Sequence, residues 1–467
     1  MPRPRQVDPA ALTLRLQIEG PLSAQALAAA LGVDRSNVSR ALATLGDQIL
    51  RLGVTRGTRY ALRREVRSAG NRFPLYRVDA AGRAHEWAEL TALQPRVWRL
   101  SWADASQFSA WARLIHDHAG VCEGFPSFLG DVRPQGYPGR TLARGLSPAL
   151  WLPSDSRNWS DDDTLVYLQA EGDDLPGNVV AGETLMRRVA ERLLAESEVV
   201  TEAVRAERFV ELAARAAAGE VAGSLVEGEQ PKFTAVMAGE AGAAPMHVIV
   251  KFADLLTTPT GRRWADLVSA EAHAHAVLRA SGESASRVRV LDAGGRRFFE
   301  IERFDRAGAH GRIGVVSLRS LYDALPEATG STTWLQAAQQ LTTAEVIDSS
   351  AERSIRLRQA FGGVIGNTDM HFGNLAFYLG DTMPLRLAPV FDMLPMQWAP
   401  TPGQAAPSPQ FAPLSPLPGE RAIWAEAAGW AVEFWRRVVE DAAVSAEFAA
   451  QARRAATQVE RMRGLFA

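Results

Sequence analysis

The chain has 467 residues, 47% of them hydrophobic and 22% charged, which is enough for about two to four globular domains with sizeable buried cores. It holds no run of about 18 uncharged apolar residues, and its charged start lacks the apolar centre of a signal peptide. The single Cys122 excludes an internal disulfide bond and a cysteine-based metal cluster. We therefore expect a cytoplasmic protein that binds no membrane.

Charge is distributed unevenly along the chain. The formal net charge is −2, but residues 1–65 carry ten arginines and five acidic residues, a balance of +5 that leaves −7 for the rest. Such asymmetry is typical of a nucleic-acid-facing module joined to a part with another task.

Residues 1–68 carry the signals of a winged helix-turn-helix domain. An amphipathic helix is expected around residues 12–18, Ser23 and Asp34 are helix caps, and Gly32 provides a tight turn between the helices "AQALAAALG" and "RSNVSRALATLG". The stretch "ILRLGVTRGTRYALRR" predicts two strands that form a wing. A small helical bundle for dimerisation or autoinhibition is the alternative.

The second of these helices is the expected DNA-reading element. Its apolar positions Val38, Ala41, Leu42 and Leu45 follow helical spacing and should face the core. Polar side chains at the helix start and on the wing are of the types that contact bases and phosphates. The predicted DNA-binding residues are Arg35, Ser36, Asn37, Arg40 and Arg56.

Residues 69–195 give no chemical signal by pattern alone. They contain short strand-like pieces, several tryptophans and a stretch dense in glycine and proline at residues 121–140, which is expected to be a loop. Helical composition dominates residues 183–218. We interpret this part as a subdomain with a helical connector.

A possible phosphate site follows, made of three elements in order. The glycine-rich stretch "GEVAGSLVEGEQPKF" holds Ser224, Gly228 and Lys232, whose amides and ammonium could approach phosphates. Lys251 then ends an apolar strand, and Glu271 lies on the next helix. In protein-kinase-like N-lobes such a lysine holds phosphates and such a glutamate holds the lysine. Each element alone is more often a plain turn or a surface salt bridge.

Two further segments complete a kinase-like order. The strand in "RRFFEIERFDRAG" stops where a hinge should offer backbone groups to adenine, and "GNTDMHFGNLAF" places Asp369 and Asn374 five positions apart, with Asp392 eighteen further on. An aspartate that orients an attacking hydroxyl, followed by an asparagine and an aspartate that bind Mg²⁺, suits phosphoryl transfer. His371 is expected to organise the loop by hydrogen bonding, and a simple polar turn is the alternative.

These motifs together resemble the HipA family of toxin-type serine/threonine kinases. The matching stretches are "GEQPKF", "VIVKF", "SAEAHAHAVLRASG", "ERFDR", "GNTDMHFGN" and "FDMLP". The resemblance implies an α+β, two-lobed protein-kinase-like fold, with an N-lobe at residues 196–305 and a helical C-lobe at residues 306–467. The fused N-terminal helix-turn-helix suits the fused branch of that family rather than its stand-alone toxins.

The resemblance also implies roles for individual residues. Asp369 would be the catalytic base and Lys251 would contact the phosphates of ATP, while Asn374 and Asp392 would bind Mg²⁺. The backbone of Glu302 to Phe304 would meet adenine. The expected cofactor-binding residues are Ser224, Gly228, Lys232, Lys251, Glu271, Glu302, Phe304 and His371. In the family's phosphate loops a serine is often autophosphorylated, and here Leu225 occupies part of that stretch.

The expected function is that of an ATP- and Mg²⁺-dependent serine/threonine protein kinase with a DNA-binding module for self-regulation. The resemblance implies a protein substrate such as an aminoacyl-tRNA synthetase or another translation component, and it leaves a homodimer open. The alternatives are a transcription regulator whose kinase-like domain senses nucleotide, and a small-molecule phosphotransferase.

A proline-rich segment follows Asp392. Residues 399–420, "APTPGQAAPSPQFAPLSPLPGE", cannot form a regular helix and are expected to be an extended, mobile, solvated linker. The last two segments, which have apolar stripes, are expected to be helices that close the C-lobe.

Overall fold

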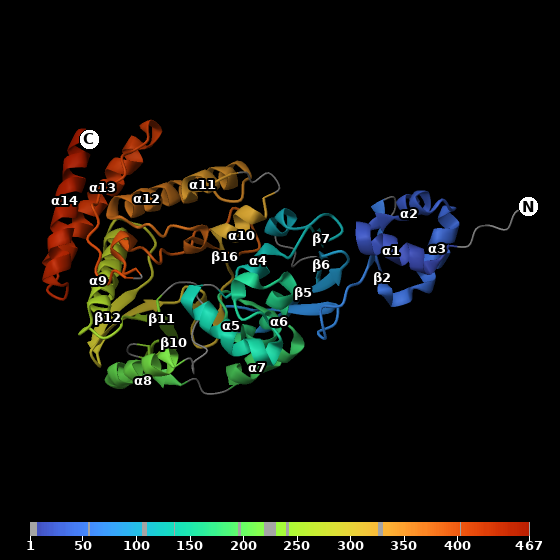
Figure 1. Ribbon diagram of the computed structural model, residues 1–467, viewed down its shortest axis with the longest axis horizontal. Coiled ribbons are helices and arrows are strands. Elements are labelled where there is room, and N and C mark those ends of the chain that lie inside the picture. The colour runs from blue at the N-terminus through green and yellow to red at the C-terminus, as the bar shows by residue number, and fades with distance from the viewer. Residues whose placement is uncertain are drawn as a thin grey trace, which may run out of the picture.

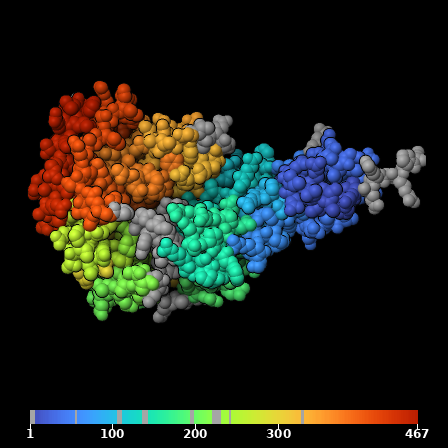
Figure 2. All heavy atoms as spheres, viewed as in Figure 1, coloured from blue at the N-terminus to red at the C-terminus, as the bar shows by residue number. Residues whose placement is uncertain are grey.

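A computed structural model describes residues 7–54, 57–104, 110–134, 136–194, 198–218, 230–239, 242–325, 330–401 and 403–466. The molecule is elongated (Figure 1), with a small N-terminal domain at one end, a middle domain beside it, and two lobes at the other end. Figure 2 shows the N-terminal domain projecting from the rest of the molecule. None of the described helices is both long and apolar enough to cross a membrane.

In residues 7–54 and 57–68 the structure describes three α-helices and a small sheet of strand order β1-β3-β2, which form the N-terminal domain. Ser23 caps α2 by accepting a hydrogen bond from the amide of Ala26, and Gly32 ends this helix in the left-handed conformation at φ 63°. Its elements are α1 (Pro9–Glu19), β1 (Leu22–Ser23), α2 (Ala24–Leu31), α3 (Arg35–Thr44), a 3₁₀ turn (Gly46–Gln48), β2 (Ile49–Leu52) and β3 (Arg59–Leu62).

The two longer strands of this sheet dock on the middle domain. Leu52 and Ala61 are buried together with Leu93 and Val121 of the middle domain. Across the same junction, Arg59 pairs with the carboxylate of Asp117. One apolar side of the expected wing therefore faces the rest of the protein.

The middle domain is a five-stranded antiparallel sheet, in the order β7-β6-β5-β4-β8, packed against helices. Its core is rich in aromatic side chains, with Trp87, Trp111 and Phe128 in mutual contact. Its elements are β4 (Arg72–Val78), β5 (Ala84–Leu93), β6 (Val97–Trp102), a 3₁₀ segment (Ala110–Leu114), β7 (Val121–Cys122), α4 (Ser127–Gly130), α5 (Gly136–Leu150), a 3₁₀ turn (Ser156–Asn158), α6 (Asp161–Glu171), a 3₁₀ turn (Gly172–Asp174), β8 (Val179–Ala181) and α7 (Glu183–Leu194).

One expectation for this region was wrong, and another was met in its main part, because α7 and α8 make up most of residues 183–218. Residues 121–140 are not all loop, because α4 and the start of α5 lie within them. The helical stretch at residues 183–218 is interrupted by the short strand β9, which joins the sheet of the next lobe in parallel with β10. In both places pairing or packing with distant segments overrides local composition.

The N-lobe is a sheet of order β12-β13-β11-β10-β9 between two helices. Phe209 of α8 packs with Phe233 and Phe298 on one face, while Val268 of α9 packs with Phe299 on the other. Its elements are β9 (Val199–Val200), a 3₁₀ turn (Glu202–Val204), α8 (Arg205–Ala217), β10 (Lys232–Met237), β11 (Met246–Phe252), α9 (Pro259–Ala280), β12 (Val288–Ala293) and β13 (Arg296–Glu302).

The C-lobe is mainly helical and carries small strand pairs at its junction with the other domains. Helix α13 packs against α9, α12 and α14, which joins the two lobes. Its elements are β14 (Arg306–Ala307), β15 (Gly311–Arg312), β16 (Val315–Ser317), α10 (Leu318–Asp323), α11 (Trp334–Thr343), α12 (Ser349–Ile365), a 3₁₀ turn (Phe372–Asn374), β17 (Ala376–Tyr378), a 3₁₀ turn (Met396–Trp398), a 3₁₀ turn (Pro418–Glu420), α13 (Arg421–Glu440) and α14 (Ala446–Phe466).

The proline-rich segment is extended, as expected, but it is not a solvated linker. Phe411 is only 7% exposed and packs against Trp398 and Trp435. The guanidinium of buried Arg263 donates a hydrogen bond of 2.6 Å to the carbonyl of Pro407. The expectation failed because scattered apolar side chains and backbone carbonyls of a non-helical segment can still anchor it to helices.

Candidate active site

Lys251 contacts both Glu271 and Asp392, which lie on two other segments of the chain. Lys251 lies near the end of β11, Glu271 on the buried side of α9, and Asp392 after β17. The ammonium of Lys251 donates hydrogen bonds of 2.8 and 3.0 Å to the two carboxylate oxygens of Glu271 and a further one to Asp392. Both Lys251 and Glu271 are buried, so the charges stabilise one another in the absence of solvent.

The ionisation of this triad follows from burial and mutual charge. Burial would lower the pKa of Lys251, but the carboxylates of Asp392 and Glu271 raise it above its ordinary value. Burial raises the pKa of Glu271, with Lys251 acting in the opposite direction. Burial acts to raise the pKa of Asp392, but Lys251 and then Lys232 outweigh it and hold the pKa below its ordinary value. Lys251 is therefore cationic and Asp392 anionic near neutral pH.

A second lysine lies beside the first. In the antiparallel pairing of β10 with β11, Lys232 is directly opposite Lys251, and directly opposed residues project from the same face of a sheet. Lys232 is 5% exposed and lines the same cavity as Lys251 and Asp392. Two cations thus lie on the N-lobe side of this cavity.

The loop after α12 is held by two asparagine side chains. Gly366 ends α12 at φ 78°, and a Cβ there would lie 2.8 Å from Trp398, so the position requires glycine. The side-chain oxygen of Asn367 accepts a hydrogen bond of 3.0 Å from the amide of Asp369. The side-chain nitrogen of Asn374 donates one of 2.8 Å to the carbonyl of Asp369.

His371 is part of the loop scaffold. Its Nδ1 accepts a hydrogen bond of 3.0 Å from the amide of Gly373, and its carbonyl accepts one of 2.9 Å from the indole of Trp334. Its Nε2 lies 4.0 Å from Oδ1 of Asp369, whose side chain is 51% exposed. Asp369 is thus the accessible carboxylate of the loop, whereas Asp392 is enclosed.

Asp392 has a strained backbone. Its φ is 52°, in the left-handed region that side-chain-bearing residues seldom adopt. The side-chain nitrogen of Asn367 donates a hydrogen bond of 3.3 Å to its carbonyl, and its carboxylate contacts Lys251. Lys251 of the N-lobe and Asn367 of the C-lobe therefore both hold Asp392 in this conformation. Strained residues that are held in this way cluster at functional sites.

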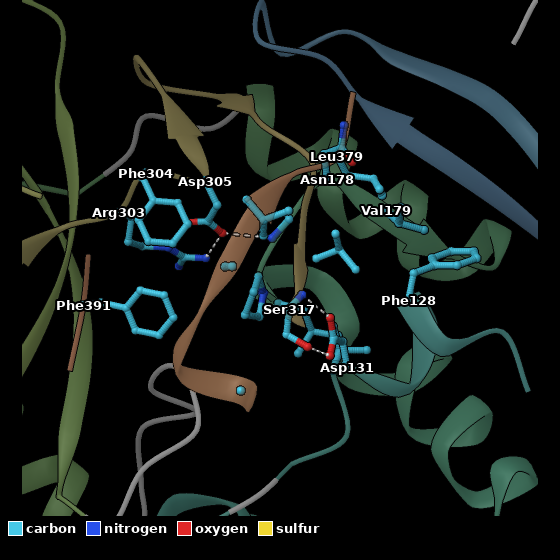
Figure 3. Close-up of a pocket in the computed structure, with 18 of the residues that line it drawn as sticks. Phe128, Asp131, Asn178, Val179, Arg303, Phe304, Asp305, Ser317, Leu379 and Phe391 are labelled. Atoms are coloured by element: carbon cyan, nitrogen blue, oxygen red, sulfur yellow. Dashed lines mark hydrogen bonds and ion pairs between the residues drawn. The ribbon is translucent and has the colours of Figure 1, made fainter. Parts of the chain in front are cut away.

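A cavity of about 430 Å³ connects these groups to the hinge between the lobes. Lys251, Asn374 and Asp392 line it together with Phe304, and Figure 3 shows the rings of Phe304 and Phe391 side by side, with their centroids 5.8 Å apart. The cavity therefore has a charged end and an aromatic wall.

The cavity does not end at the hinge. It continues into the middle domain, where Phe128, Leu168 and Val179 line it, and where Asp131 accepts a hydrogen bond of 2.7 Å from the amide of Ser317. Figure 3 shows Phe128, Val179 and Asn178 across the cavity from Phe304 and Asp305. Sequence reasoning missed this wall, because nothing local marks residues of one domain as neighbours of a site in another.

The structure thus brings together most of the residues predicted for the nucleotide site. Glu302 is the last residue of β13, Phe304 follows two positions later, and both line the cavity. The Glu302 side chain pairs with Arg287 at 2.9 Å. Ser224 and Gly228 lie outside the described residues. The sequence analysis assigned no role to Asn367 or Phe391. The pattern Asn367-Thr-Asp369 is a typical turn sequence and could have indicated the role of Asn367.

The predicted DNA-binding residues do not all face outward. Arg35, Ser36 and Arg40 are exposed on α3, but Asn37 is buried, and its side-chain oxygen accepts a hydrogen bond of 2.5 Å from Arg40. The outward placement of Asn37 was wrong because residue 37 lies one turn before Ala41, on the core stripe. Arg56 lies outside the described residues.

Two protein families and a toxin of known sequence match this chain. The YjjJ-like toxin middle domain matches residues 69–190, and the HipA-like C-terminal domain matches residues 224–463. The chain is 34% identical to toxin YjjJ of Escherichia coli (strain K12) over 435 residues, which cover 93% of this chain and 94% of that protein. The chain belongs to the HipA family. Within it, this HipA-family protein has the middle domain of the YjjJ-like branch, which bears out the resemblance seen in the sequence.

A solved structure shows the same fold. The toxin–antitoxin complex of HipA, HipB and operator DNA from Shewanella oneidensis MR-1 matches 84% of this chain and 97% of its own, with a TM-score of 0.54 and 16% identity. The HipA-like, mixed α and β architecture expected from the sequence is therefore confirmed for this HipA-family protein.

Proposed function

We propose that this protein is an ATP-dependent serine/threonine kinase of the HipA toxin type. The observation that carries the proposal is the contact of Lys251 with both Glu271 and Asp392 at the charged end of the inter-lobe cavity. A buried lysine held by a helix glutamate, with an aspartate beside it, is the arrangement that places phosphates in kinases. Membership of the HipA family supports the same conclusion.

The residues present fit a magnesium ion. Asp392 offers a carboxylate and Asn374 an amide oxygen, the hard oxygen ligands that Mg²⁺ prefers when phosphates and water complete its shell. No group of three or more His, Cys, Asp or Glu side chains in the described part of the chain could hold a metal by itself. This suits an ion that arrives with a nucleotide. When bound, it would neutralise charge on the transferred phosphoryl group.

The proposed division of labour follows the geometry. Asp369, the accessible carboxylate, accepts the proton of the substrate hydroxyl while the hydroxyl oxygen bonds to the γ-phosphorus and the bond to the bridging oxygen of ADP breaks. Lys251, and Lys232 opposite it, supply positive charge to the phosphates. His371 keeps the loop in place through Gly373.

We propose that the N-terminal domain is a winged helix-turn-helix that binds DNA. Helix α3 lies on the outer side of the domain in Figure 1, and its exposed Arg35, Ser36 and Arg40 suit the major groove. The Shewanella HipA was solved with HipB and operator DNA, which supports a DNA partner for this family. Here the DNA-binding part would be fused to the kinase and would serve self-regulation.

The kinase proposal is tested with purified full-length protein, radiolabelled ATP and Mg²⁺. The expected result is transfer of phosphate to serine or threonine of a lysate protein by the wild type and none by Asp369→Ala. Phosphoproteomics of cells expressing the two forms identifies the substrate. Phosphorylation of a small molecule alone, or equal labelling by both proteins, would contradict the proposal.

A further inference from the structure

The hinge between the lobes is joined to the middle domain by a cluster of four charged side chains. These are Asp174, at the end of the 3₁₀ turn after α6, and the hinge residues Arg303, Asp305 and Arg306, hereafter the hinge clamp. The clamp connects parts of the chain that are about 130 positions apart. Arg303 and Asp305 also line the cavity that holds Lys251 and Asp392.

Asp174 contacts both arginines. Its Oδ1 accepts hydrogen bonds of 2.9 Å from Arg303 and 2.8 Å from Arg306. Asp305 accepts two bonds of 3.0 Å from Arg303 and one of 2.6 Å from Arg306. The two acids and two bases alternate, so each charge has two opposite charges as neighbours.

The clamp also fixes backbone on both sides of the junction. Arg306 donates hydrogen bonds to the carbonyls of Leu175 and Gly177, at 2.9 and 3.1 Å. In return the amide of Gly177 donates one of 3.0 Å to Asp305, which Figure 3 shows beside Arg303. Backbone of the middle domain and side chains of the hinge are therefore locked together in both directions.

The environment makes these bonds strong. The side chains of Arg303 and Arg306 are 2% and 4% exposed. Burial alone would raise the pKa of Asp305, but Arg303 and Arg306 hold it well below its ordinary value, and Asp305 is therefore ionised. In such a site, removal of one carboxylate leaves two buried guanidinium groups that share the single remaining carboxylate.

We propose that Asp174 of the middle domain is a positioning residue for the nucleotide, which acts by fixing the hinge through Arg303 and Arg306. This inference rests on the kinase proposal, because it assigns the hinge backbone from Glu302 to Phe304 to adenine. Asp174 itself does not line the inter-lobe cavity; it lines a smaller one of about 200 Å³ on the other side of Arg303. Its effect on the nucleotide therefore passes through the arginines.

The variant Asp174→Asn keeps the shape of the side chain and removes its charge. Its matched control is Asp173→Asn, because Asp173 is the neighbouring aspartate and its carboxylate pairs with Arg188 and Arg192 of α7 instead of the hinge arginines. Asp173 is buried, whereas Asp174 is partly exposed. The first measurement is hydrogen–deuterium exchange of the full-length protein without nucleotide. We expect faster exchange of the hinge amides at residues 300–308 in Asp174→Asn only, with unchanged exchange at residues 366–376.

The second measurement is the affinity for a fluorescent ATP analogue with Mg²⁺. We expect Asp174→Asn to bind it about tenfold more weakly than wild type, the reduction typical of removing one charge-assisted hydrogen bond, and Asp173→Asn to bind it equally well. In turnover, KM for ATP should rise while kcat stays within about twofold, since uniform binding is weakened and the chemistry is untouched.

The outcomes separate this inference from the function on which it rests. Equal hinge exchange and equal nucleotide affinity in Asp174→Asn and wild type overturn the positioning role and leave the kinase proposal intact. Absence of nucleotide binding by the wild type overturns both. If Asp174→Asn does not fold, Arg306→Lys takes its place. Lysine keeps the positive charge but cannot donate hydrogen bonds to Asp174, Asp305 and the two carbonyls at the same time. Hydrogen–deuterium exchange and nucleotide affinity are then measured for this variant, with the same expected results.

Discussion

Lys251 and Glu271, twenty positions apart in the sequence, meet through two hydrogen bonds of 2.8 and 3.0 Å between β11 and α9. This contact joins the sheet of the N-lobe to the helix behind it. Asp392 extends it to the C-lobe, so one ammonium connects three segments of the site.

Replacement of Glu271 by glutamine should lower activity more than stability. Glutamine has the same shape but no charge, so Lys251 would be drawn to Asp392 and away from the position in which it meets phosphates. We expect kcat/KM for ATP to fall about a hundredfold, equivalent to about 2.7 kcal/mol. Glu460→Gln, on the exposed side of α14, is the control and should leave the rate unchanged. A wild-type rate for Glu271→Gln would show that the pair is only structural.

Asp369→Asn should lower kcat severely and leave folding intact. The carboxylate is half exposed, and the loop is held by the backbone groups of residue 369 through Asn367 and Asn374, which the substitution keeps. Removal of a general base costs about 10²- to 10⁴-fold in kcat. The melting temperature should stay within about 1 °C of wild type. A large drop in the melting temperature would mean that Asp369 serves the fold instead.

Stability should fall in acid because of His275. This histidine on α9 is fully buried, and burial, reinforced by Lys251, lowers its pKa to about 3; Arg279 acts in the same direction, and Asp392 and the carbonyl of Ser286 oppose it. Between about pH 6.5 and 3 the unfolded chain binds a proton here that the folded chain does not. The free energy of unfolding should therefore decline as pH falls, by about 2 kcal/mol at pH 5.

Chemical denaturation at about pH 7.5 and pH 5 measures this effect. In His275→Gln the decline between the two values should be smaller than in wild type by about 2 kcal/mol. His118→Gln, at an exposed position, should decline as much as wild type. Identical declines in all three proteins would assign the acid sensitivity to other groups.

The N-terminal helix α3 offers a test that separates DNA contact from packing. Arg35→Ala and Arg40→Ala should weaken DNA binding, and the removal of one phosphate-binding side chain should reduce the slope of log affinity against log salt concentration by about 1. Asn37→Ala should instead lower the melting temperature, because Asn37 is buried under Arg40. Gel-shift titrations at several salt concentrations, with melting curves of the same variants, check both. Salt-independent binding by the wild type would contradict the DNA proposal.

The proline-rich segment should contribute to stability. Phe411→Ala removes a ring that packs on Trp398 and Trp435 and should cost about 3 kcal/mol of unfolding free energy. Leu417 is 66% exposed, so Leu417→Ala should change the free energy of unfolding by less than about 0.5 kcal/mol. Urea titrations of both variants measure these changes. If the proline-rich segment were a solvated linker, neither substitution would change the free energy of unfolding.

Much of the site could be read from local spacing. Asp369 and Asn374 share one turn, and Asn374 can reach the carbonyl of Asp369 only because five positions separate them. The position of Lys251 at the end of a strand and of Glu271 on the next helix also follows from local patterns, and it predicts their pairing. Asn37 shows the limit of that reasoning, since a shift of one position on α3 decided whether it faced solvent or the core.

The sequence by itself determined the helices of the N-terminal domain, the family and the polar residues of the kinase-like site, because hydrophobic periodicity, caps and short motifs act over a few residues. Only the tertiary structure decided which distant groups share an environment. Asp174 contacts Arg303 and Arg306, which lie about 130 positions later in the chain, only because the middle domain packs against the hinge. Phe411 is buried only because helix α13, which follows it in the chain, packs against it. No local pattern encodes such contacts, because burial and charge pairing are properties of the assembled chain.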